Sequence, residues 1–210
     1  MVALLKQSNI IPFPACDAPT QGKSNEWYTP AYIIEAARKV LGTIDLDPAS
    51  CEQANQVVRA TRFYSAKDNG LAQEWRGNVW LNPPYGRVNG SGASVIRMFV
   101  TKLVDEYETG KIEQAILLTT VQTNCTWFQL LWNYLICFTD SRVHFIKPMN
   151  GILAPDGRTS HTLGTALVYL GPNEQAFIDN FRDFGHIAKS IAGPRRDTVQ
   201  ATLWEGNHTR

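Results

Sequence analysis

Residues 82–85 form the tetrapeptide Asn82-Pro83-Pro84-Tyr85, which directly follows a short apolar run. The Asn82 side chain offers a carbonyl acceptor, and the fixed φ angles of the two prolines set the direction of the Pro83 carbonyl, a second acceptor. Two convergent acceptors can hold an NH₂ group, and the ring of Tyr85 can stack on a planar base or amide. Prolines commonly end strands, but a strand end explains neither Asn82 nor Tyr85. The tetrapeptide therefore predicts a site for an amino group attached to a planar system.

Three aspartates stand where a carboxylate can accept hydrogen bonds from a ligand. Asp45 and Asp47 share one face of the alternating segment 43–47, which Pro48 ends, and Asp68 lies in the sequence Asp-Asn-Gly. Asp47, at the end of its segment, is well placed to face a ligand. Asp45 fits a hydrogen-bonded strand aspartate equally well, and Asp68 also fits ordinary turn chemistry.

The elements that would position these residues alternate between helix and strand. Helical periodicity predicts a helix over 29–42, with Thr29 as N-cap, Pro30 as first helical residue and Gly42 at its end. Further helices are predicted at 94–110, 126–136 and 173–185. Strands are predicted at 43–47, 78–82, 114–121, 141–147 and 165–171. This order predicts an open α/β sheet with a mostly parallel core, flanked by helices, in which DLDP and NPPY lie at strand carboxyl ends, where such sheets bind ligands.

Length and composition limit the remaining possibilities. The 210 residues suit one domain, predicted at 25–210, after a flexible arm at 1–24. A net charge of +1 gives no global basic field, so a nucleic-acid partner would need a local patch. The 4 cysteines are scattered without metal-ligand spacing, so we expect reduced thiols in a cytoplasmic protein, no bound metal and no disulfide framework. No apolar run approaches membrane-spanning length.

The motifs resemble those of a known enzyme family. LNPPYGR is similar to the catalytic motif of amino-methyltransferases that use S-adenosylmethionine and modify adenine N6, cytosine N4 or a glutamine amide. The chain further resembles the phage-type DNA N6-adenine methyltransferases over about residues 25–185. The resemblance lies in the motifs EWYTP, DLDPAS and DNGL followed by NVWLNPPY, in this order. The resemblance implies a Rossmann-like methyltransferase fold. That fold would be abbreviated here, because no Gly-rich turn follows the first strand and no acidic residue that would bind a ribose is evident between Ser50 and Asp68.

The resemblance also implies roles for individual residues. Asn82 and the Pro83 carbonyl would accept hydrogen bonds from N6 of an adenine flipped out of DNA, while Tyr85 stacks on the base. Asp47 would accept from the amino group or ribose of S-adenosylmethionine, and Asp68 from its adenine. Thr29 and the first turn of its helix would receive the methionine carboxylate. The full set of predicted cofactor contacts is Trp27, Tyr28, Thr29, Asp45, Asp47, Pro48, Asp68 and Asn82.

Contacts with DNA are predicted in loops 86–93 and 147–160, through Arg87, Lys147 and Arg158. The expected activity is methylation of adenine N6 in DNA by a monomer, in a bacterial cell and with a phage or prophage origin. Two kinds of alternative remain open. The same chemistry could act on cytosine N4, RNA adenine or a protein glutamine, or the chain could be a catalytically silent nucleic-acid-binding module.

Overall fold

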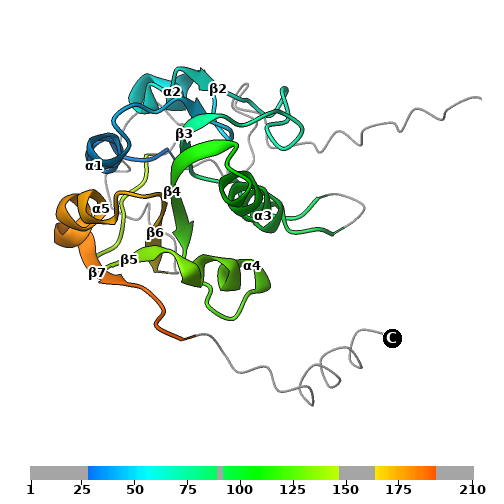
Figure 1. Cartoon of the computed structure of the whole chain (residues 1–210). Helices are drawn as coiled ribbons and strands as arrows, with labels where there is room; N and C mark the ends of the chain where they lie inside the picture. The colour runs from blue at the N-terminus through cyan, green and yellow to red at the C-terminus, as the bar shows by residue number, and fades with distance from the viewer. Residues whose placement is uncertain (1–27, 89–91, 147–163, 193–210) are drawn as a thin grey trace, which may run out of the picture.

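The computed structural model describes residues 28–88, 92–146 and 164–192, and these build a seven-stranded sheet with helices on both faces (Figure 1). The predicted arm at 1–24 lies outside the described residues, as do Trp27, Lys147 and Arg158. No helix in the described part of the chain is long and apolar enough to cross a membrane.

Helices and strands alternate along the described chain. The helices are α1 (Ala31–Leu41), α2 (Glu52–Val58), α3 (Val95–Glu108), α4 (Thr126–Gln129) and α5 (Glu174–Phe181), with 3-10 turns η1 (Leu130–Asn133) and η2 (Arg182–Phe184). The strands are β1 (Leu46–Asp47), β2 (Arg62–Phe63), β3 (Gly77–Leu81), β4 (Ile112–Thr120), β5 (Leu135–Thr139), β6 (Thr165–Leu170) and β7 (Gly185–Ala188).

The sheet has the strand order β2-β1-β3-β4-β6-β5-β7. The pairings among β2, β1, β3 and β4 are parallel, whereas β6 runs antiparallel to both β4 and β5, and β7 runs antiparallel to β5. Strands β1 to β5 therefore share one direction, and β6 and β7 oppose it. The predicted α/β class is confirmed. The sheet is nevertheless mixed, because β6 inserts between β4 and β5 and makes both of its pairings antiparallel.

Two hydrophobic layers cover the faces of the sheet. On one face α1 and α5 pack together, and their core includes Ile33, Trp80, Tyr169 and Phe177. On the other face α3 and α4 cover a core that includes Trp75, Phe99 and Phe128. Figure 1 shows these two helix pairs on opposite sides of the strands. Burial on both faces explains why β4 and β6 read as continuous apolar runs.

Several predicted element boundaries were wrong. Helix α1 begins at Ala31 with Pro30 as its N-cap, so Thr29 precedes the cap instead of forming it. The predicted helix at 126–136 ends as a 3-10 turn, because Leu135 and the residue after it pair with β6 as the start of β5. No strand forms over the described part of 141–147, where Ile146 makes only an isolated bridge with Tyr28. The short elements α2, β2 and β7 were not predicted.

The connections place a change of winding direction next to the two motifs. From β1 the chain passes through α2 to β2 on one side, while β3 pairs with the other side of β1 and leads to β4. Ligands of open α/β sheets bind at such a point, outside the carboxyl ends of the strands. Asp47 ends β1 and Asn82 follows β3, so this edge is where both motifs meet.

Candidate active site

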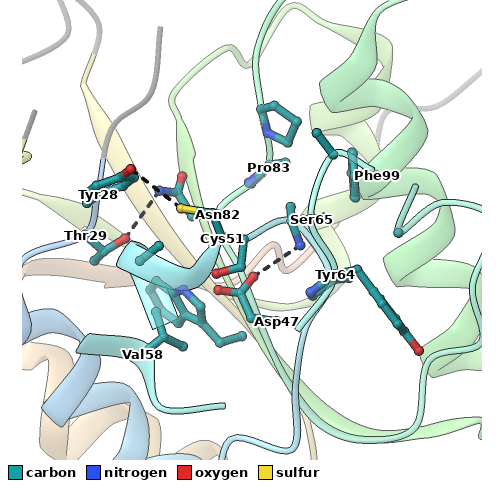
Figure 2. Close-up of a pocket in the computed structure, with 18 of the residues that line it drawn as sticks. Tyr28, Thr29, Asp47, Cys51, Val58, Tyr64, Ser65, Asn82, Pro83 and Phe99 are labelled. Carbon is teal, nitrogen blue, oxygen red and sulfur yellow. Dashed lines mark hydrogen bonds between the residues drawn. The ribbon is translucent and has the colours of Figure 1, made fainter. Parts of the chain in front are cut away.

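A pocket opens at the carboxyl ends of β1 and β3 (Figure 2). The space between its walls is about 860 Å³, open solvent at its mouth included. Most of the residues predicted from the two motifs and the segment before α1 line it. These are Tyr28, Thr29, Asp47, Pro48, Asn82, Pro83, Pro84 and Tyr85.

Asp47 lies at the base of this pocket with only 3% of its surface exposed. Its Oδ1 accepts a hydrogen bond from the backbone N–H of Ala49 at 3.2 Å. Burial raises the pKa of Asp47 to about 7, against smaller opposing effects of the Ser50 hydroxyl and the Ala49 amide. A buried carboxylate of this kind gains most from a ligand that brings a positive charge or strong hydrogen-bond donors.

The loop that follows Asp47 replaces the expected Gly-rich turn. Its sequence, Pro48 to Cys51, leads directly into α2, and the Ser50 backbone N–H donates to the Tyr64 carbonyl at 2.9 Å. The buried Ser50 hydroxyl lines the pocket and lies close enough to Asp47 to lower its pKa, but it forms no hydrogen bond of normal geometry among the described residues. A buried hydroxyl without a partner costs free energy, so this atom is suited to a polar ligand group.

Thr29 and Asn82 meet across the pocket from different segments of the chain. Thr29 is buried, and its hydroxyl accepts a hydrogen bond from Asn82 Nδ2 at 3.3 Å. This contact turns the amide so that its nitrogen faces Thr29 and its carbonyl oxygen faces the other way, as Figure 2 shows. The predicted N-cap residue thus orients the predicted catalytic amide.

Tyr28 forms part of the wall beside Thr29. Its hydroxyl accepts a hydrogen bond from Cys51 Sγ at 3.6 Å, which joins the segment before α1 to the loop before α2. Its backbone pairs with Ile146 through two hydrogen bonds of 2.9 Å. These contacts fix the segment before α1 against the pocket.

Tyr85 is anchored to the neighbouring strand. Its hydroxyl accepts a hydrogen bond from the backbone N–H of Thr120, at the carboxyl end of β4, at 3.0 Å. Burial raises the pKa of the Tyr85 hydroxyl, so the group stays neutral at physiological pH. The side chain is half-buried, packs against the core under α3 and lines the pocket.

The structure does not place Asp45 or Asp68 in the pocket. Asp45 precedes β1 at the opposite edge of the sheet, where its carboxylate accepts hydrogen bonds from the Thr43 hydroxyl at 3.0 Å and the Asn78 N–H at 2.8 Å. Asp68 is exposed and accepts from the backbone and hydroxyl of Ser65, at 2.8 and 2.7 Å. These hydrogen bonds lower the pKa of Asp68. In this structure the carboxylates of both aspartates therefore accept hydrogen bonds from backbone N–H and hydroxyl groups of residues outside the carboxyl ends of β1 and β3.

The loop around Asp68 still contributes to the site through other residues. Ser65, Ala66 and Gly70 line the pocket, and Gly70 packs so closely that a Cβ atom there would lie 1.9 Å from the Pro48 carbonyl oxygen. Sequence reasoning also missed other lining residues, namely Ala49, Ser50, Cys51, Ala54, Val58, Tyr64, Trp80 and Phe99. Only Gly70, in the Asp-Asn-Gly turn, carried a local signal. The others read as ordinary core or loop residues.

Of the predicted DNA contacts, only Arg87 falls within the described residues. It lies on the exposed segment after Tyr85, where its guanidinium donates to the Gly92 carbonyl at 2.8 Å. Its backbone bridges to Ser94. Arg87 thus joins the two sides of a short loop beside the site.

Comparison with known proteins gives two matches. The family model "DNA N-6-adenine-methyltransferase (Dam)" matches residues 18–162, a range that contains every pocket residue. A DNA N-6-adenine-methyltransferase of Escherichia phage T1 is 34% identical over 104 residues, which cover 49% of this chain and 38% of the phage protein. The chain thus matches well under half the length of that relative. No solved structure matches the chain significantly.

Proposed function

Because the chain belongs to the DNA N-6-adenine-methyltransferase (Dam) family, we propose that it transfers a methyl group from S-adenosylmethionine to N6 of adenine in DNA. One observation supports this proposal most strongly. The buried carboxylate of Asp47 and the Asn82-Pro83 acceptor pair end two neighbouring parallel strands and line one pocket. A single pocket can therefore hold a methyl donor and an amino group side by side.

The end of the pocket around Asp47 suits the cofactor. S-adenosylmethionine would supply a methyl group activated on a positively charged sulfur. Asp47 would accept hydrogen bonds from its amino group or ribose, and the Ser50 hydroxyl beside Asp47 would gain a partner of normal hydrogen-bond geometry. Tyr28 and Pro48 would form apolar walls on either side. These residues fit the group through one buried acidic acceptor and one unsatisfied hydroxyl.

The end of the pocket around Asn82 suits the amino group to be methylated. A base paired in the duplex cannot reach these atoms, so the adenine would leave the stack. The Asn82 side-chain oxygen and the Pro83 carbonyl would accept hydrogen bonds from N6. Both acceptors gain strength as positive charge develops on that nitrogen, which favours the transition state over the ground state.

Thr29 and Tyr85 would hold this end of the pocket in its productive geometry. The hydrogen bond from Asn82 Nδ2 to the Thr29 hydroxyl orients the amide before any substrate arrives. The Tyr85 hydroxyl is tied to β4 through Thr120, so the ring is held beside the acceptors, where it can stack on the flipped base. Positioning and polarisation would suffice, without a covalent intermediate on the enzyme.

The test is to incubate the purified protein with duplex DNA and S-adenosylmethionine and to identify the methylated nucleosides by mass spectrometry. We expect N6-methyladenine. A matched Asn82→Ala reaction should give almost none while the protein remains folded. N4-methylcytosine, a product on RNA alone or no methylated base at all would contradict the proposal.

A further inference from the structure

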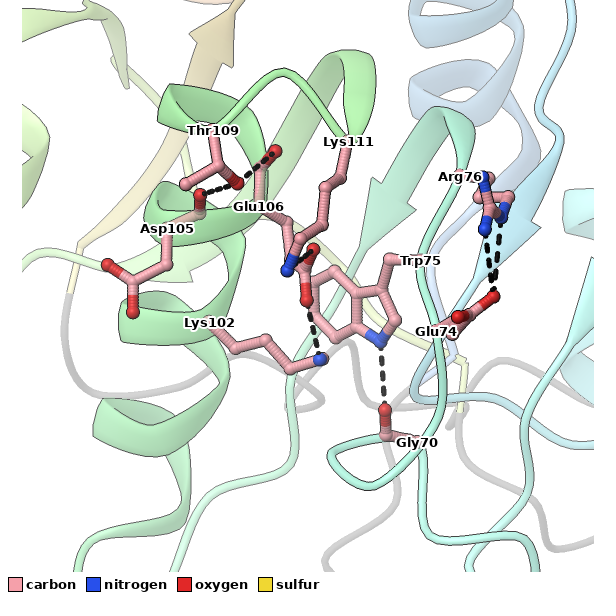
Figure 3. Close-up of polar contacts among 9 residues, drawn as sticks. All are labelled: Gly70, Glu74, Trp75, Arg76, Lys102, Asp105, Glu106, Thr109 and Lys111. Carbon is pink, nitrogen blue, oxygen red and sulfur yellow. Dashed lines mark hydrogen bonds and ion pairs between the residues drawn. The ribbon is translucent and has the colours of Figure 1, made fainter.

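Trp75 is a fully buried tryptophan that touches the wall of the pocket without lining it. Its side chain is 1% exposed, and its indole Nε1–H donates to the Gly70 carbonyl at 2.8 Å (Figure 3). Gly70 lines the pocket and lies directly against the carbonyl of Pro48, the residue after Asp47. One hydrogen bond therefore connects Trp75 to the peptide that faces the base of the pocket.

Helix α3 holds the indole ring in place from the other side. The ring stacks on Phe99, with ring centroids 6.3 Å apart and planes inclined by 27°, and Phe99 itself lines the pocket. The ammonium of Lys102 lies 5.3 Å from the ring centroid, within the range of a cation–π contact.

The position of Lys102 is itself constrained by an ion-pair network. Glu106 pairs with Lys102 at 2.7 Å and with Lys111 at 3.2 Å, and only 7% of its surface is exposed. Figure 3 shows Lys102 and Lys111 both reaching Glu106 beside the Trp75 ring. The indole ring is thus held by contacts from α3 and, through Glu106, from Lys111, which lies three residues beyond the end of the helix.

The backbone hydrogen bonds within the loop that Trp75 holds form short-range turns, while the Tyr64 hydroxyl donates to the Glu74 carbonyl at 3.1 Å and Leu71 packs against the core. Backbone hydrogen bonds join Ser65 to Asp68, Asn69 to Ala72 and Gly70 to Gln73, each pair three residues apart. Such turns fix the local shape of a loop but not its distance from the opposite wall. The bond from Trp75 adds a connection to the core of the domain, so it can set where Gly70 lies relative to Pro48.

We propose that Trp75 is a positioning residue for the cofactor pocket, which acts by holding the Gly70 peptide against the Asp47-Pro48 strand end. The inference rests on the proposed use of this pocket for S-adenosylmethionine. An ordinary core tryptophan would contribute to stability alone. A positioning residue also changes cofactor affinity in the folded protein.

The central experiment compares Trp75→Phe with Trp127→Phe. Phenylalanine keeps an aromatic ring beside Phe99 but cannot donate to Gly70. Trp127 is similarly buried, contacts Phe128 and lies outside the pocket lining, so it is the matched control. We expect Trp75→Phe to raise the Kd and KM for S-adenosylmethionine about threefold to tenfold, as expected for one lost hydrogen bond, with kcat at saturation little changed. The control should lower thermal stability by a similar amount and leave Kd unchanged.

A second variant and a second measurement cover the case in which Trp75→Phe folds poorly. Lys102→Met keeps the aliphatic stem over the ring and removes the charge, so we expect a smaller rise in Kd, about twofold. Hydrogen exchange should be faster at residues 65–73 in both variants and unchanged in α1. Equal Kd values for wild type, Lys102→Met and any folded Trp75→Phe protein would overturn the inference.

The two proposals fail in different ways. If the wild-type protein does not bind S-adenosylmethionine, the proposed function fails and the role of Trp75 fails with it. If the wild type binds and methylates DNA while both variants bind equally well, only the role of Trp75 is overturned.

Discussion

At the scale of single residues, the charge of Asp47 changes with pH near neutrality, because burial raises the pKa of its carboxyl group to about 7. If the carboxylate form binds S-adenosylmethionine, affinity should increase as pH rises towards 7 and then level off, with up to about a tenfold change per pH unit below the pKa. Calorimetry from about pH 5.5 to about pH 8.5 would measure this. Asp47→Asn should bind more weakly and with a flat profile. An equally steep profile in Asp47→Asn would show that another group titrates.

The same raised pKa has the opposite consequence for the stability of the free protein. The unfolded chain releases the Asp47 proton near pH 4, whereas the folded protein keeps it up to about pH 7. The free energy of unfolding should therefore fall across this window, by about 4 kcal/mol at most. Asp47→Asn should remove that fall, so the variant should be more stable than the wild type at pH 8 and about equal to it near pH 4. Denaturant unfolding at both pH values would measure the difference, and a wild type that is as stable as Asp47→Asn at pH 8 would contradict it.

Substitutions of Asn82 and of Tyr85 should impair methylation in distinguishable ways. Asn82→Ala removes an acceptor that strengthens in the transition state, so turnover should fall about a hundredfold or more while S-adenosylmethionine still binds. Tyr85→Phe keeps the ring and loses the bond from the Thr120 N–H, so activity should stay within a few-fold and stability should fall by about 1 kcal/mol. Tyr85→Ala should lose stacking worth about 1 to 3 kcal/mol and capture the flipped base poorly, which 2-aminopurine fluorescence would report. An active Asn82→Ala enzyme would end the proposed mechanism.

Motif residues were predictable at this scale because their chemistry is local. The NPPY residues and Asp47 lie next to prolines that end strands, so their place at a strand end follows from the sequence itself. Asp45 shares its strand face with Asp47 but lies two residues earlier, about 7 Å towards the amino ends of the strands. There the Asp45 carboxylate accepts a hydrogen bond from the Asn78 backbone N–H. Trp80 and Phe99 read as core residues, and only the packing of β3 and α3 shows that they also reach the pocket.

At the scale of elements, the loop from β2 to β3 contains a glycine, Gly70, at a position where the neighbouring backbone leaves no room for a side chain. A methyl group on Gly70 would meet the Pro48 carbonyl oxygen at 1.9 Å, so the loop must move away from β1 to accept it. Gly70→Ala should therefore weaken S-adenosylmethionine binding about tenfold or more and lower the melting temperature. Gly110→Ala is a suitable control. Its positive φ of 71° costs about 1 kcal/mol, but no atom lies within 4 Å of the added methyl group. Equal cofactor affinity in both variants would count against the close approach of Gly70 to β1.

Long elements with a clear period were predictable, whereas the short elements α2, β2 and β7 were not. The 14 residues of α3 and the 9 of β4 carry enough apolar periodicity to identify them. The strand β2, which was not predicted, has 2 residues and exists because parallel pairing with β1 holds it. The segment 126–136 combines residues that suit either state, and pairing with β6 decides that its end is a strand. Such choices depend on partners distant in the sequence.

For the whole molecule, the sheet extends beyond the part that the family model matches. That match ends at residue 162, whereas β6 begins at Thr165 and inserts between β4 and β5 in the middle of the sheet. The described residues on both sides of this limit therefore share one core. The sequence predicted β6 as a buried strand but could not reveal its direction, because an apolar run has the same pattern in parallel and antiparallel sheets.

The charge of the whole molecule leads to a prediction about DNA binding. With a net charge of +1, affinity cannot come from a global field and should depend on a few local cations, for which Arg87, Lys147 and Arg158 are the candidates. Each phosphate neutralised on duplex DNA should contribute about 0.9 to the slope of log K against log salt concentration. Arg87→Gln, Lys147→Gln and Arg158→Gln should each lower the slope by about that amount. Lys39→Gln should leave the slope unchanged, because this exposed lysine lies in the last turn of α1, away from the pocket. The end of α1 contacts the opposite end of β3, where the Leu41 carbonyl accepts a hydrogen bond from the Asn78 side chain. If Lys39→Gln lowers the slope and the other three variants do not, the DNA lies on a different face of the sheet.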